Sequence, residues 1–243
     1  MRADSLVLAL AAAALHPACR ADRAQTAAAK ASAPRAAHAV PTPIADGERF
    51  SPEITNPYLP LSLVRYAELE GEEGWIVRAV AERTRTVAGV DCLVLVEQEY
   101  SDGVLTELSS TYLAQDGRGN VWSFGESVEE YLGGQVVGHD GSWMVGLDAT
   151  EPGLSMPAEP RVGQRFQPGG PAAAAAPVDE VDALGVELSV PAGRFQGVLV
   201  VKEREHAGEG AARRYYAPGV GLISEDATLN LITIGPLGAV TTP

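Results

Sequence analysis

Cysteine and histidine are scarce in this chain, and that scarcity excludes several kinds of reaction centre. The 243 residues include two cysteines and four histidines. The sequence contains no Cys-x-x-Cys, His-Glu-x-x-His, Gly-x-Ser-x-Gly or phosphate-loop Gly-Lys-Ser pattern. We therefore expect no metal site and no cofactor, and no recognisable catalytic centre of these types.

A long apolar run is also lacking. The stretch from Leu6 to Leu15 follows Arg2 and is far shorter than the roughly 20 residues that cross a bilayer. A basic residue followed by a short apolar run is typical of an export signal. Residues 1–19 are thus predicted to be a signal peptide, and the protein is expected outside the cytoplasm, in the periplasm or on the outer surface.

Cys19 ends this leader, in a segment that resembles the lipobox of bacterial lipoproteins. In that motif the cysteine receives a diacylglycerol; Ala18 fits the pattern, whereas His16 stands where leucine is usual. Two alternatives stay open, an acylated Cys19 that anchors the protein to a membrane and ordinary cleavage after Ala39. Residues 20–49 are rich in alanine and proline and are predicted to be a disordered tether.

Basic residues are few in the part of the chain that follows. Five of the 18 basic residues and two of the 32 acidic residues precede Val40, so the remainder carries a formal charge of −17. Such a surface repels phosphate backbones, which makes nucleic acid an unsuitable partner. With Cys19 acylated or removed, Cys92 has no cysteine to pair with, and its apolar neighbours predict a buried, unreactive thiol.

What the chain does have is a succession of strand patterns separated by turn residues. Residues 50–243 are predicted to form one mainly β domain, a single antiparallel curved sheet or an open or half barrel. The expected strands are Trp75–Val87, Cys92–Tyr100, Val104–Leu113, Val121–Phe124, Leu184–Val190, Gly197–Glu205, Ala212–Tyr216, Gly221–Asp226 and Thr228–Ile234. Residues 116–120 are expected to form a hairpin loop, and residues 171–177 a surface insertion.

Two turn motifs near the C-terminus carry a resemblance to a group of known proteins. The segments VPAGRF (residues 190–195) and YYAPGVGLI (residues 215–223) resemble the ends of exported bacterial β-rich proteins of unknown function. ITNPYLPL (residues 54–61) and YLAQDGRGNVWSFGE (residues 112–126) are similar to the same uncharacterised proteins. The resemblance implies an exported protein with a curved half-barrel like that of lipoprotein carriers, and it implies no activity.

Large apolar side chains in the middle of the chain suggest a function in binding. Trp122, Phe124, Trp143 and Met156 are expected to line the concave face of the sheet, where they would contact an apolar or amphiphilic small molecule, such as a lipid, without catalysis. The same residues are also those expected in the core of a domain that has few other aromatic side chains.

Two alternatives of other classes stay open. A hydrolase would use an acidic pair near Glu97 and Glu126, with one carboxyl as acid and the other as base. A structural or assembly factor would present the acidic face of the domain to basic partners.

Overall fold

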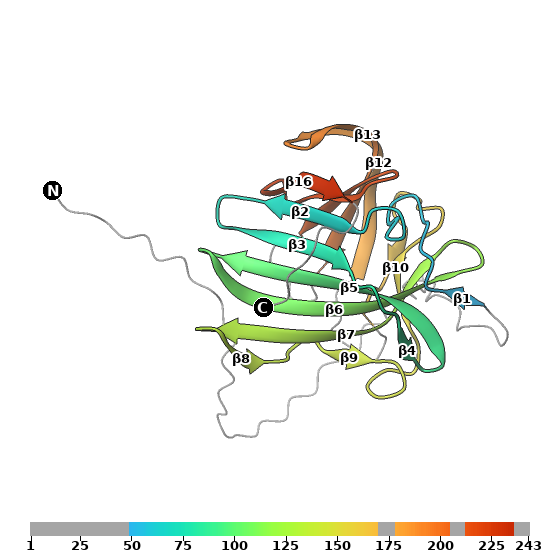
Figure 1. Cartoon of the computed structure of the whole chain (residues 1–243). Helices are drawn as coiled ribbons and strands as arrows, with labels where there is room; N and C mark the ends of the chain where they lie inside the picture. The colour runs from blue at the N-terminus through green and yellow to red at the C-terminus, as the bar shows by residue number, and fades with distance from the viewer. Residues whose placement is uncertain (1–48, 170–177, 205–211, 236–243) are drawn as a thin grey trace, which may run out of the picture. The chain divides into compact units, whose positions relative to one another are not determined.

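The computed structural model describes residues 49–169, 178–204 and 212–235, which form sixteen β-strands (Figure 1). They are β1 Phe50–Ser51, β2 Tyr66–Glu70, β3 Gly74–Val80, β4 Arg85–Val87, β5 Val90–Ser101, β6 Val104–Asp116, β7 Val121–Leu132, β8 Gln135–Gly138, β9 Trp143–Met144, β10 Gly153–Met156, β11 Arg165–Phe166, β12 Val178–Val190, β13 Gly193–Arg204, β14 Arg213–Ala217, β15 Gly221–Glu225 and β16 Leu229–Gly235. The prediction of a mainly β domain is confirmed.

All named strands belong to one sheet with antiparallel ladders. Its order is β10-β7-β6-β5-β3-β2-β16-β15-β14-β13-β12-β11, so the pairing of β2 with β16 joins the two halves of the chain. The sheet is not closed into a barrel, because no ladder between described residues joins β10 to β11. The two ends nevertheless come close together, since a Cβ placed on Gly153 would lie 2.1 Å from the carbonyl oxygen of Pro168. The sheet therefore curves around an interior.

Tight turns explain why consecutive strands pair. Asp102 and Gly103 connect β5 to β6 with φ angles of 49° and 80°, the geometry of a two-residue hairpin. Between β14 and β15, the amide of Val220 donates to the carbonyl oxygen of Ala217 over 3.1 Å. Gly219 there has a φ of 76°, which suits the third position of a type II turn.

One predicted strand, Trp75–Val87, is wrong as a continuous element. The structure ends β3 at Val80 and begins β4 at Arg85. Val80 pairs with Leu95 and Arg85 with Cys92, so four residues on one side face two residues on the other. Ala81 still donates its amide to the carbonyl oxygen of Val94, and the exposed Glu82, Arg83 and Thr84 form the bulge.

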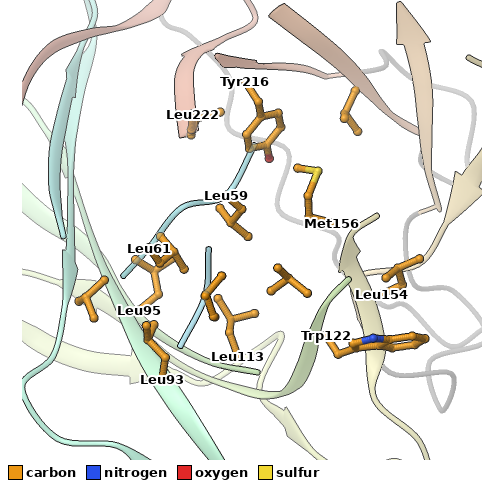
Figure 2. Packing of buried hydrophobic residues seen from close by; sticks show 14 of the residues in the cluster. Leu59, Leu61, Leu93, Leu95, Leu113, Trp122, Leu154, Met156, Tyr216 and Leu222 are labelled. Carbon is orange, nitrogen blue, oxygen red and sulfur yellow. The ribbon is translucent and has the colours of Figure 1, made fainter. Parts of the chain in front are cut away.

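The core lies inside the curve of the sheet and includes a segment that precedes the first long strands. Ile54 is fully buried, and Leu59 and Leu61 are nearly so. Figure 2 shows Leu59 between side chains of opposite parts of the sheet, with Tyr216 on one side and Leu113 on the other. Residues 54–61 thus cross the interior and fill part of it.

Several sequence predictions lie outside the described residues. These are the signal peptide at residues 1–19, the tether up to residue 48 and the insertion at residues 171–177. Within the described ranges, no helix is long and apolar enough to cross a bilayer.

Candidate binding site

The interior of the sheet is not filled completely. A hollow of about 190 Å³ remains, with contributions from both halves of the chain. Its lining includes Leu59, Arg78, Leu95, Glu97, Thr111, Leu113, Ser123, Glu126, Trp143, Ser155, Met156, Pro168, Gly169, Asp179, Arg214 and Tyr216. Since a water molecule needs roughly 10–15 Å³ of such space, the hollow has room for a small molecule.

Four of the residues predicted from the sequence line this one hollow. Trp143 and Met156 were expected to bind an apolar ligand, and Glu97 and Glu126 to form an acidic pair. The register explains why Trp143 and Glu126 meet, because they are direct cross-strand partners of β9 and β7. Opposite residues of an antiparallel pair point to the same face of the sheet.

The other two predicted contact residues are not among those lining the hollow. Phe124 is 1% exposed and its ring meets that of Phe50 edge-to-face, with centroids 5.1 Å apart. Trp122 is held by its indole Nε1, which donates to Asp116 Oδ2 over 2.9 Å. The role of Trp122 and Phe124 as ligand contacts stays a prediction, and a ligand in this hollow would not need to touch them.

Asp116 organises the hairpin between β6 and β7. It accepts hydrogen bonds from the amides of Arg118 and Asn120, from the Asn120 side chain and from Trp122. Burial alone would raise the pKa of Asp116, but these hydrogen bonds outweigh burial and hold the pKa below its usual value. The prediction of a hairpin loop here is confirmed.

Two arginines bring positive charge into the hollow, and both are engaged by carboxylates. Arg78 Nε lies 2.6 Å from Glu97 Oε1, and the Arg78 side chain is only 12% exposed. Arg214 Nη2 lies 3.2 Å from Asp179 Oδ1 and 2.6 Å from Glu203 Oε2. Burial raises the pKa of Asp179 to about 6, although Arg214 acts in the opposite direction.

Glu126 differs from these carboxylates because no arginine or lysine nitrogen of the described residues lies within ion-pair distance of it. Its hydrogen-bond donor is Thr111 Oγ1 at 3.4 Å. Burial raises the pKa of Glu126 to about 7, and the neighbouring charges of Glu97 and Glu107 add to the effect. Near neutral pH this carboxyl can therefore hold or release a proton.

Further carboxylates lie on the same face of the sheet, outside the lining of the hollow. Glu99, Glu107 and Glu130 are direct neighbours on β5, β6 and β7. Burial raises the pKa of Glu107, and the charge of Glu130 raises it further. The inner face is therefore richer in carboxylates than in arginines.

The sequence patterns did not identify Arg78, Asp179, Arg214 or Tyr216 as lining residues. Each of these polar residues lies in a strand and has apolar residues near it in the sequence. That pattern is only a weak signal that the polar side chain points inward. Their meeting depends on long-range pairing, because the hollow combines β3 and β5–β7 with β12 and β14. No local pattern contains that information.

Among the described residues the one cysteine is Cys92, which lies outside the lining of the hollow. Its side chain is fully buried and free of any disulfide. Burial, with a contribution from Asp91, raises the pKa of the thiol to about 12. The predicted unreactive thiol agrees with this environment.

The described residues hold no group of three or more histidine, cysteine, aspartate or glutamate side chains placed to bind a metal ion.

Comparisons of the chain with family models, curated proteins and solved structures gave no match. The resemblance to exported β-rich proteins therefore stays a prediction from the sequence, and any function has to be argued from the hollow itself.

Proposed function

We propose that this protein binds a small amphiphilic molecule, without catalysis, in the hollow inside its curved sheet. The observation that carries the proposal is the mixed lining of that hollow. Leu95, Leu113 and Met156 offer apolar surface, while Arg78 and Glu126 offer charge. Binding sites of this kind combine an apolar wall with a few polar groups that fix orientation.

The proposal includes export to the cell envelope. The leader at residues 1–19 supports export, and Cys19 supports a lipid anchor. The intact mass of the mature protein tests both, because acylation leaves a chain that begins at a lipid-bearing Cys19, whereas cleavage after Ala39 leaves an unmodified chain that begins at Val40. An unprocessed N-terminus beginning at Met1 would contradict export.

Binding is tested with three probes that share one chain and differ in head group: hexan-1-ol, hexylamine and hexanoate. Isothermal titration calorimetry at pH 8 should give saturable binding of at least one probe. Trp143→Ala removes a wall of the hollow and should weaken that binding tenfold or more. Trp75→Ala is the matched control, because Trp75 stacks on Tyr100 and lies outside the lining. The absence of binding by all three probes would refute the proposed function.

A hydrolase is the second candidate, and one observation favours it. Glu97 and Glu126 line the same hollow, where Glu97 is bound by Arg78 while burial raises the pKa of Glu126 to about 7. Carboxyls in such different surroundings can act as base and acid. A hydrolase should release nitrophenol from a panel of nitrophenyl glycosides and esters, and Glu126→Gln should abolish that release.

A further inference from the structure

The charge inside the hollow is unbalanced, and the imbalance indicates what kind of head group would bind there. Arg78 and Arg214 face Glu97, Glu126 and Asp179 in the lining, and Glu203 also binds Arg214. The three lining carboxylates, when ionised, exceed the two guanidinium groups by one negative charge, and Glu203, outside the lining, adds a second.

Both arginines have carboxylate partners at short distance. Arg78 binds Glu97 at 2.6 Å, and Arg214 binds Glu203 at 2.6 Å and Asp179 at 3.2 Å. Arg214 Nε is buried without a hydrogen-bond partner among the described residues, so an anionic head group could accept one hydrogen bond there. For every other contact with the two guanidinium groups it would have to compete with Glu97, Asp179 and Glu203. It would also meet repulsion from Glu126, so an anion is disfavoured at this site.

Glu126 is the lining carboxylate that lacks a cationic partner among the described residues. Thr111 donates its one hydrogen bond, which at 3.4 Å is long. Burying an unpaired charge is costly, and a cation brought in by a ligand would reduce that cost.

Trp143 adds a second feature that favours a cation. It pairs directly with Glu126 across β7 and β9, and both side chains line the hollow. An indole face attracts an ammonium group, and a carboxylate beside it supplies the opposite charge. The apolar side chains of Leu95, Leu113 and Met156 remain for the hydrocarbon part of the ligand.

We infer that the ligand of the hollow is an amphiphile with a protonated amine, and that this amine binds the carboxylate of Glu126 beside the Trp143 ring. The inference rests on the proposed function, because it specifies the head group of the molecule that the hollow binds.

The same three probes test this inference by calorimetry at pH 8. An alkylammonium group stays protonated there, since its pKa is close to the 10.4 of lysine. We expect hexylamine to bind at least tenfold more tightly than hexan-1-ol, and hexanoate to bind least. This comparison uses the unaltered protein and does not depend on the folding of any variant.

Glu126→Gln provides the residue-specific test. It should weaken hexylamine binding tenfold or more while hexan-1-ol binding changes less than twofold. Glu130→Gln is the matched control, because Glu130 lies on the same strand but outside the lining. It should leave both affinities unchanged.

The outcomes separate this inference from the proposed function. Tightest binding of hexanoate, or of hexan-1-ol, would overturn the amine inference while leaving a binding function in place. Unchanged hexylamine binding in Glu126→Gln would overturn it as well. Failure of all three probes to bind would overturn both.

Discussion

Replacing Glu126 by glutamine should stabilise the protein at high pH and leave its stability almost unchanged at low pH. Burial raises the pKa of Glu126 from 4.5 to about 7, so the folded protein holds this proton to a higher pH than the unfolded chain does. The contribution of Glu126 to the free energy of unfolding is therefore fully present below about pH 4.5 and is lost as the pH rises through about 7. Glutamine resembles the protonated carboxyl and does not ionise.

The structure sets the size of this effect. One pKa unit corresponds to about 1.4 kcal/mol, so the rise of the pKa gives a ceiling of about 3 kcal/mol at pH 8. The side chain is only partly buried and lines a hollow that is partly open to solvent. We therefore expect about half of that ceiling, roughly 1.5 kcal/mol.

Urea unfolding followed by tryptophan fluorescence, without ligand, measures the free energy of unfolding at pH 4 and pH 8. The free energy of unfolding of Glu126→Gln should exceed that of the unaltered protein by roughly 1.5 kcal/mol at pH 8 and by less than about 0.5 kcal/mol at pH 4. Glu130→Gln serves as the control for removing a negative charge elsewhere on β7. A variant that is less stable at pH 8, or equally changed at both pH values, would show that ionisation of Glu126 does not destabilise the folded protein.

Three further predictions concern the scaffold. Asp116→Ala should lower the free energy of unfolding by about 3 kcal/mol, because it leaves the buried Trp122 indole without its acceptor; a loss below about 1 kcal/mol in urea unfolding would contradict this. Gly153→Ala should lower the melting temperature by several degrees, since the new Cβ would lie 2.1 Å from a carbonyl oxygen, whereas Gly117→Ala, with open space around it, should change it little. Equal melting temperatures for the two glycine variants would show that the sheet ends are not in contact. Cys92 should resist a thiol reagent at pH 8 in the folded protein and react in urea, and fast labelling without urea would contradict its burial.

The sequence predicted the strands well where local chemistry decides them. Period-two patterns and turn residues identified β5, β6 and the turn at Gly219. Both signals are local, because alternation and positive φ depend on residues that are close together in the sequence. The bulge between β3 and β4 was missed, since it arises from the pairing of both with β5. The strand propensity of residues 75–87 does not depend on how many residues of β5 pair with them, so it cannot predict the bulge.

The site was predictable only in part, for the same reason. Trp143 and Glu126 were identified separately by residue type, but their pairing across β7 and β9 depends on register. Arg214 was not identified at all, because it reaches Asp179 through strands 35 positions apart in sequence. A hollow formed by both halves of the chain becomes visible only when the sheet has curved.

The most direct test of amine binding in the hollow is a crystal structure of the protein soaked with hexylamine at pH 8. The alkyl chain should lie in the hollow against Met156 and Leu113, with the nitrogen within hydrogen-bond distance of Glu126. A hollow that contains only water while hexylamine lies elsewhere or is absent would contradict it.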